Sequence, residues 1–256
     1  MVVTKSQLLS DIKAMGVEKG DVVLVHSSYK SIGNVEGGAN TVIQALIEAV
    51  GDIGTIVFPT LSYSPCTQTK QFDYANTPSC TGYLSEQFRL YHGSVRSLHP
   101  THSCTAYGKD AEFLTSTHHL DNTPVGSNSP ITKLALLGGK VLMVGCGLRP
   151  MTSMHGVEET IGRHLIDSKS TTYTITDAQN KTFTKEYYNH NFHPEKGPQY
   201  KQCYDRIVNV MPEGSIVKGY IGQAESYLVD ASILWKTAHR VMLENRDYFV
   251  DFLGIK

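Results

Sequence analysis

The residues of this sequence that are best suited to acid–base chemistry are His155, Glu158 and Glu159, in the segment 140–164. Histidine has a side-chain pKa near neutrality, which makes it a common general base. On a helix, a carboxylate three or four residues further along lies on the same face as the imidazole. When that carboxylate accepts a hydrogen bond from one ring nitrogen, the other nitrogen becomes the better base. The spacing indicates a histidine–carboxylate pair, and an ordinary surface pair at a helix start is the alternative.

The neighbouring residues predict the elements that position this pair. Residues 141–144 form a short apolar run ended by glycine, which indicates a buried parallel strand. Thr152 or Ser153 then offers a side-chain oxygen for the N-cap of a helix that carries His155. Ligands of open α/β sheets usually bind beyond the carboxyl ends of the strands. The pair is therefore expected at a ligand-binding edge of a sheet.

A buried strand is predicted over 21–25 and a helix over 41–50. A second polar group directly follows this strand and consists of His26, Ser27 and Ser28. A strand, a loop rich in serine and glycine, and a helix N-terminus present N–H groups and hydroxyls to an anion. Such a loop suits a phosphate or a developing oxyanion. The loop lacks both the Gly-Lys-Ser/Thr of a P-loop and the G-x-G-x-x-G pattern. A purely structural loop is therefore the alternative.

A third polar group lies in the segment 95–107 and contains Arg96, His99, His102 and Ser103. Two histidines three residues apart could bind a metal ion. No third ligand with a fitting spacing is evident, so we expect no metal.

The pattern of apolar residues predicts one α/β domain over residues 1–256, with a central mixed or parallel sheet flanked by helices. Residues from about 165 to 220 are expected to form a small antiparallel subdomain, because the segment 171–186 alternates like a β-hairpin. The polar segment 61–80 predicts an irregular binding loop. The segment 187–204 holds four tyrosines and two histidines, which could line a ligand site or pack a surface loop.

Composition excludes several classes of protein. The 256 residues are 40% hydrophobic, and 23 Lys+Arg against 24 Asp+Glu give a net charge of -1. Nucleic acid and anionic membranes are poor partners for such a chain. Five cysteines without C-x-x-C spacing indicate free thiols in a reducing compartment. Neither a signal peptide nor a transmembrane run is apparent, which favours a cytoplasmic protein.

Five segments, in their order and spacing, resemble the aminoglycoside 3-N-acetyltransferase family over essentially the whole chain. No single segment is decisive, whereas five in register are specific. The segments are HSSYKSIGNVEGGANTVIQALIEAVGDIGTIVFPT (26–60), SEQFRLYHGSVRSLHPTHSCTAYG (85–108), PVGSNSPITKL (124–134), MTSMHGVEE (151–159) and GYIGQAESYLVDASILWKTA (219–238).

The resemblance implies a transferase that uses acetyl-CoA as co-substrate, with the family's own α/β fold, distinct from the GNAT fold. It makes His155 the catalytic base, with Glu158 at the matching carboxylate. The acceptor would be a primary amine of an amino sugar, bound by the segment of about 165–220. The resemblance places the following residues on the acetyl-CoA side of the site: His26, Ser27, Ser28, Arg96, His99 and Ser103.

The chain departs from the family in its charge. Family members that act on polycationic antibiotics tend to be acidic, whereas this chain has a pI of about 6.8. The segment 187–205 offers only Glu195 and Asp205 against Lys196 and Lys201. Charge therefore favours an amino sugar carried on a nucleotide, with a classical aminoglycoside as the alternative.

The mechanism expected from these residues is direct transfer assisted by His155. A covalent intermediate on Cys104 or Cys146 is one alternative. A non-catalytic module that binds CoA or a sugar with the same fold is another. A homodimer also remains open.

Overall fold

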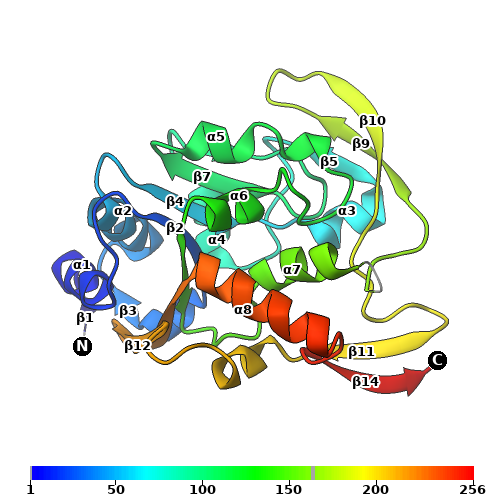
Figure 1. Ribbon diagram of the computed structural model, residues 1–256. Helices are drawn as coiled ribbons and strands as arrows, with labels where there is room; N and C mark the ends of the chain where they lie inside the picture. The colour runs from blue at the N-terminus through cyan, green and yellow to red at the C-terminus, as the bar shows by residue number, and fades with distance from the viewer. Residues whose placement is uncertain (1, 163–164) are drawn as a thin grey trace.

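The computed structural model describes residues 2–162 and 165–256, so the last two residues of the segment 140–164 lie outside the described part. A seven-stranded sheet forms the centre of the molecule (Figure 1). Its strands are β2 (Val22–Ser27), β4 (Thr55–Pro59), β6 (Val95–Arg96), β7 (Cys104–Gly108), β8 (Lys140–Val144), β12 (Ile216–Ile221) and β13 (Ala224–Asp230).

The spatial order of the strands is β12-β13-β8-β2-β4-β7-β6. The middle three, β8, β2 and β4, run parallel to one another, and every other neighbouring pair is antiparallel. The expected mixed α/β sheet is confirmed. The buried strands predicted over 21–25 and 141–144 are present as β2 and β8. Asp21 lies outside β2, and β2 extends further than expected because His26 and Ser27 belong to it.

Helices cover both faces of this sheet (Figure 1). Successive strand residues point to opposite faces, so Val23 and Val25 pack into one hydrophobic core while Leu24 packs into the other. The helices α1 (Lys5–Ala14), α2 (Gly38–Val50) and α4 (Tyr83–Arg89) cover the first face, and α5 (Ala111–Thr115), α6 (Pro130–Leu136), α7 (Ser153–Ile161) and α8 (Ala231–Glu244) cover the second.

The segment 61–80, expected to be irregular, contains α3 (Tyr63–Thr69) and β5 (Gln71–Asp73). The strand β5 pairs in parallel with β9 (Thr171–Thr176), about a hundred residues further along the chain, so no local pattern marks it. The predicted hairpin is present, because β9 pairs with β10 (Thr182–Tyr187) across a turn in which Asn180 has a φ of 59°.

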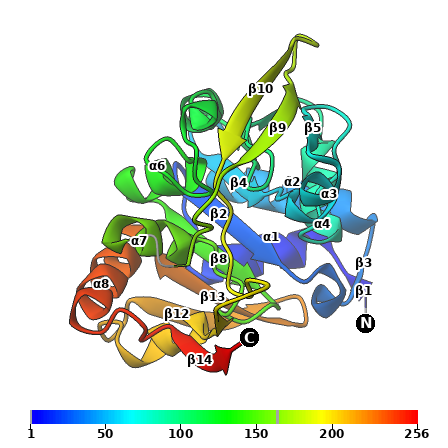
Figure 2. The same ribbon diagram turned by 90° about the vertical axis from the view of Figure 1, so that its right-hand side faces the viewer.

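Two smaller pairs complete the sheets. The strand β1 (Val2–Val3) pairs with β3 (Asn34–Val35), and β11 (Pro198–Gln202) pairs with β14 (Val250–Ile255). Figure 2 shows the β9–β10 hairpin at one end of the molecule and β14 at the other, with the chain from β10 to β11 passing between them. Short 3₁₀ helices occur at η1 (Tyr29–Ile32), η2 (His118–Leu120) and η3 (Tyr204–Asn209).

No helix within residues 2–162 and 165–256 is both long and apolar enough to cross a lipid bilayer.

Candidate active site

A cavity of about 570 Å³ lies where the central parallel strands end. The strand β2 contributes its last two residues, and the loop after β8 contributes a cysteine and an arginine. The chain between β10 and η3 forms a further part of the wall. The lining residues used below are His26, Ser27, Thr101, His102, Cys146, Arg149, His155, His190, Phe192, Gln202 and Tyr204.

The helix α7 carries the central histidine into this cavity. Thr152 occupies the N-cap position, as predicted, but its side chain makes no capping hydrogen bond, and the hydroxyl of Ser153 is buried without a partner in the described part of the chain. Packing against α8 positions α7 instead. A Cβ added at Gly156 would lie 2.4 Å from the ring of Trp235, so this glycine lets the two helices approach closely. His155, in the first turn of α7, is thereby positioned at the cavity wall.

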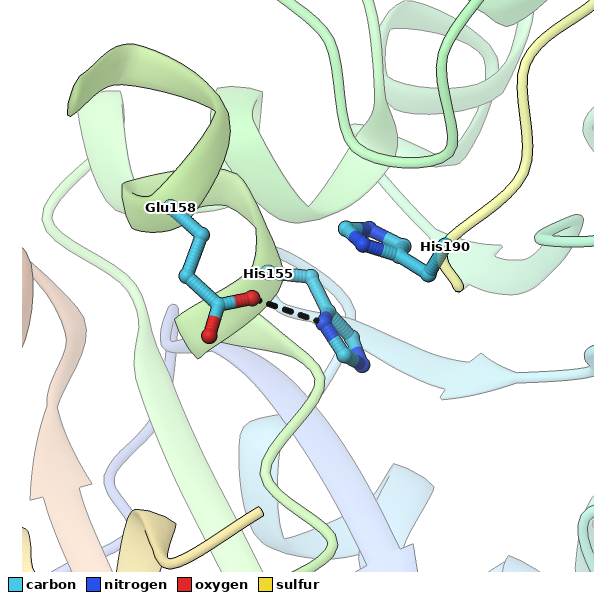
Figure 3. Close-up of side chains that lie close together, drawn as sticks. All are labelled: His155, Glu158 and His190. Carbon is cyan, nitrogen blue, oxygen red and sulfur yellow. Dashed lines mark hydrogen bonds and ion pairs between the residues drawn. The ribbon is translucent and has the colours of Figure 1, made fainter. Parts of the chain in front are cut away.

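His155 forms a compact network with Glu158 and Tyr204 (Figure 3 shows the two α7 residues). The Nδ1 atom of His155 lies 3.2 Å from Oε2 of Glu158 and 2.9 Å from the hydroxyl of Tyr204. That hydroxyl donates toward both carboxylate oxygens at 2.9 Å. These partners assign the ring proton to Nδ1, because only a protonated nitrogen can donate to the carboxylate. The other ring nitrogen, Nε2, is then free to accept a proton.

The Nε2 atom of His155 lies 3.4 Å from the side-chain amide nitrogen of Gln202, which can donate to it. Burial lowers the pKa of His155, and the charge of His190 lowers it further, while the hydrogen bond to Glu158 raises it. The net shift is downward, so the ring is neutral at pH 7. A neutral imidazole with a fixed Nδ1 proton is equipped to act as a general base.

A second histidine–carboxylate pair lies beside the first. The ring of His190 lies 4.1 Å from the ring of His155, and its Nε2 atom is 3.3 Å from Oε1 of Glu159. Burial alone would raise the pKa of Glu159, but its contacts with His190 and with the N–H of Val125 lower it overall. Glu158 is thus the residue that orients His155, and Glu159 faces the other ring.

One ring nitrogen of each histidine and one oxygen of Glu158 lie within 4.8 Å of one another, a spacing that a metal site could use. Against this, Nδ1 of His155 and both oxygens of Glu158 already share hydrogen bonds with Tyr204. The expected absence of a metal stays a prediction.

Two of the three residues in the polar group after the first apolar run reach the cavity. The Nε2 atom of His26 and the hydroxyl of Ser27 are buried there without a hydrogen-bond partner in the described part of the chain. Burial, with a smaller contribution from His155, lowers the pKa of His26 to about 4. Ser28 accepts a hydrogen bond from Ser31 and is not among the cavity residues.

Arg96 and Ser103 lie away from the cavity wall. The guanidinium of Arg96 donates to the Ser103 hydroxyl at 3.0 Å and to the carbonyl of Thr77 at 2.6 Å, and it lies over the ring of Phe72. Burial lowers its pKa to about 10. These contacts hold three segments of backbone together.

His99 has a similar structural position. Its Nδ1 atom accepts the backbone N–H of His102 at 3.0 Å, and its Nε2 atom donates to the carbonyl of Thr123 at 3.1 Å. His99 therefore sets the conformation of the loop whose next residues, Thr101 and His102, do line the cavity. This arrangement disfavours direct contact of acetyl-CoA with Arg96, His99 or Ser103.

The sequence did not predict roles for Tyr204 and Gln202 in the site, and it indicated His102 only as a possible metal ligand, a role that we did not expect. Tyr204 and His190 stood out only as members of an aromatic segment, because nothing in local spacing connects them with His155. His190 lies in the connection from β10 to β11 and Tyr204 begins η3 after β11, and tertiary contacts bring both to His155.

The two cysteines considered as nucleophiles have unreactive environments. Burial raises the pKa of Cys104 to about 12 and that of Cys146 to about 11. Both thiols are protonated at pH 7, and Cys104 is fully buried outside the cavity wall. The geometry favours direct transfer over a covalent cysteine intermediate.

Comparison with known proteins gives consistent matches. A family model described as aminoglycoside 3-N-acetyltransferase matches residues 24–243. Aminoglycoside N(3)-acetyltransferase III from Salmonella sp. is 37% identical over 172 residues, which cover 60% of this chain and 60% of that enzyme.

Two solved structures resemble the whole chain. AAC-IIIb, solved as a binary complex with CoASH, is 28% identical with a TM-score of 0.81, covering 96% of this chain and 98% of that one. A mutant of aminoglycoside acetyltransferase AAC(3)-IVa, solved in complex with a gentamicin, is 26% identical with a TM-score of 0.83, covering 97% of this chain and 92% of that one. The chain belongs to the aminoglycoside 3-N-acetyltransferase family.

Proposed function

We propose that this protein transfers the acetyl group of acetyl-CoA to a primary amine of an amino sugar, with His155 as the general base. The observation that carries the proposal is the orientation of His155. Glu158 and Tyr204 hold its Nδ1 atom, while the ring lines a cavity large enough for a thioester and an amine. A relative of the same fold was solved with CoASH, which supports acetyl-CoA as the donor.

The reaction requires the movement of one proton. The lone pair of a neutral amine attacks the thioester carbon while Nε2 of His155 takes a proton from the amine nitrogen. The tetrahedral intermediate then collapses, the C–S bond breaks, and the imidazolium returns the proton to the departing thiolate. Glu158 stabilises the transient imidazolium, as a buried carboxylate does in other histidine bases. A positioned base of this kind contributes on the order of 10²–10⁴-fold to the rate.

The polar atoms at the end of β2 suit the donor. His26 and Ser27 present a buried ring nitrogen and a hydroxyl, both without partners in the described part of the chain, to the cavity. Such groups can bind a polar part of acetyl-CoA or the developing charge on the thioester oxygen. Arg96, His99 and Ser103 would act on the donor only through the loop that they brace.

The acceptor has two candidates. Relatives solved with a gentamicin and with sisomicin favour an aminoglycoside. The second candidate, an amino sugar carried on a nucleotide, is favoured by the lining of the cavity, which contains Arg149 and no aspartate or glutamate among the described residues. In either case, the segment of about 165–220 would contribute the acceptor side, through His190, Phe192 and Gln202.

The test is release of the CoA thiol from acetyl-CoA in the presence of a panel of amines that includes gentamicin, sisomicin and nucleotide-linked amino sugars. Thiol release that depends on both acetyl-CoA and an amine supports the transferase. If no amine promotes release although CoA binds, the chain is a non-catalytic binding module and the proposal is wrong.

A further inference from the structure

A second hollow of about 370 Å³ adjoins the candidate active site. Four residues line both spaces, including Arg149 and Gln202, so the two are continuous. The second hollow, which we call the basic groove, adds His193 and Lys201. Gln202 lies beside Nε2 of His155, so the groove opens onto the nitrogen that takes the proton.

The groove has a net positive charge, although Asp251, outside the lining, interacts electrostatically with Lys201. Arg149 and Lys201 are both exposed, and neither forms an ion pair with any residue in 2–162 or 165–256. No aspartate or glutamate lines either hollow in that part of the chain. Asp251 is the residue opposite Lys201 in the β11–β14 ladder, but its carboxylate is bound by Arg206.

The carboxylates closest to the reaction centre are also compensated. Glu158 and Glu159 keep only 6% and 7% of their side chains exposed, and each is paired with a histidine. They therefore offer nothing to a cationic ligand in the open part of the cavity. A polycation would meet Arg149 and Lys201 without a balancing carboxylate, and like charges placed together at a binding site disfavour a ligand.

The same two side chains suit a phosphate. Arginine binds phosphate oxygens through paired N–H groups, and lysine adds a mobile point charge. We propose that the basic groove, through Arg149 and Lys201, binds a phosphate or diphosphate carried by the amine acceptor. This inference rests on the proposed acetyl transfer and specifies its acceptor as an anionic amino sugar.

The phosphates of acetyl-CoA are the other phosphate groups that could bind in the basic groove. The groove is lined by residue 149, residues 190–193, residues 200–202 and Leu253. It does not include His26 or Ser27, which we assign to the donor. This separation favours the acceptor as the source, and the experiment below distinguishes the two.

The test compares glucosamine, glucosamine 1-phosphate and UDP-glucosamine as acceptors, measured by thiol release from acetyl-CoA. We expect kcat/KM for the phosphorylated acceptors to exceed that for glucosamine by at least about tenfold. The ratio of kcat/KM for a phosphorylated acceptor to kcat/KM for glucosamine should fall about tenfold in Arg149→Gln and in Lys201→Gln. The reason is that a charged hydrogen bond of about 1.5 kcal/mol corresponds to a tenfold change. Using a ratio cancels any general damage to the enzyme.

The control is Lys196→Gln, which removes an exposed lysine of the same segment that does not line the groove and should leave the ratio unchanged. Equal kcat/KM for glucosamine and its phosphorylated forms, or a ratio unaffected by both groove substitutions, would overturn the inference. A preference for gentamicin over all phosphorylated acceptors would do the same.

Two further measurements are needed. The first shows whether the groove binds phosphates of acetyl-CoA or of the acceptor, and the second tests phosphate binding independently of acetyl transfer. If the groove substitutions raise KM for acetyl-CoA with glucosamine as acceptor, the groove binds phosphates of the donor and the acceptor assignment is wrong. Calorimetric binding of inorganic diphosphate to the whole protein needs no turnover. Binding that weakens about tenfold in Lys201→Gln supports the subsite even if acetyl transfer fails, and absence of binding overturns it.

Discussion

The imidazole rings of His155 and His190 lie 4.1 Å apart and are tilted by only 32° (Figure 3). Each ring is paired with its own glutamate, His155 with Glu158 and His190 with Glu159. Both rings cannot carry a positive charge at this separation without mutual repulsion. A positive charge on His190 therefore lowers the pKa of His155, the proposed base.

This relationship predicts the effect of His190→Asn on the pH dependence of kcat/KM. Burial is the largest cause of the lowered pKa of His155, and the charge of His190 is the second. Asparagine cannot be protonated, so the pKa of His155 should rise and the acid limb of the profile should move to higher pH. His239→Asn, at an exposed position outside both hollows, is the control. An unchanged or lower acid limb would contradict this electrostatic role.

Removing the base itself should have a larger and different effect. His155→Gln should lower kcat by about 10²–10⁴-fold, because the imidazole acts mainly in the transition state. Acetyl-CoA binding, measured by calorimetry, should change little. A variant with turnover close to that of the unmodified protein would show that another group takes the proton.

The hydroxyl of Tyr204 should affect both kcat and stability, because it binds the pair formed by His155 and Glu158. Tyr204→Phe removes the donor to both oxygens of Glu158 and leaves that buried carboxylate without this partner. We expect kcat to fall about tenfold and the free energy of unfolding to fall by about 1–3 kcal/mol. KM for acetyl-CoA should be unchanged, and Tyr220→Phe, at an exposed position, should have neither effect. Full activity in Tyr204→Phe would mean that Glu158 alone orients the ring.

The thiol environments predict transfer without an acetyl-enzyme. The pKa of Cys146 is raised to about 11, so its thiol is a weak nucleophile at neutral pH. Cys146→Ser should retain activity, and intact-mass measurement after incubation with acetyl-CoA alone should show no added acetyl group. A stable acetyl adduct that an acceptor amine removes would instead support a covalent route.

Buried histidines predict a loss of stability in mild acid. Burial lowers the pKa of His26 to about 4 and also lowers that of His99, His102 and His118. The unfolded chain binds these protons at its ordinary histidine pKa near 6.5, so it gains protons first as the pH falls. Stability is complete above about pH 6.5 and is lost toward pH 4, with about 3 kcal/mol from His26 alone. Urea unfolding at pH 7, 6 and 5 measures this, and a midpoint that does not change with pH would exclude the effect.

Several features of the fold follow from local sequence. The apolar residues within 21–25 and 141–144 predict buried strands, and the alternating segment 171–186 predicts a hairpin, because these patterns depend on neighbouring residues. The resemblance to the acetyltransferase family, visible in five segments in register, is confirmed by the family match.

In the candidate site, too, some contacts follow from local sequence and others arise only from the tertiary structure. By itself, the sequence determined that His155 could meet Glu158, because helical geometry brings residues three apart onto one face. Only the tertiary structure decided that Tyr204 completes this pair and that His190 lies against its ring, since these residues are 49 and 35 positions away in the sequence. His190 lies between β10 and β11, and Tyr204 begins η3. It also decided that Arg96 braces backbone instead of facing the cavity. Whether a polar side chain meets a ligand or its own protein depends on what the fold packs against it, and no periodicity in the sequence encodes that.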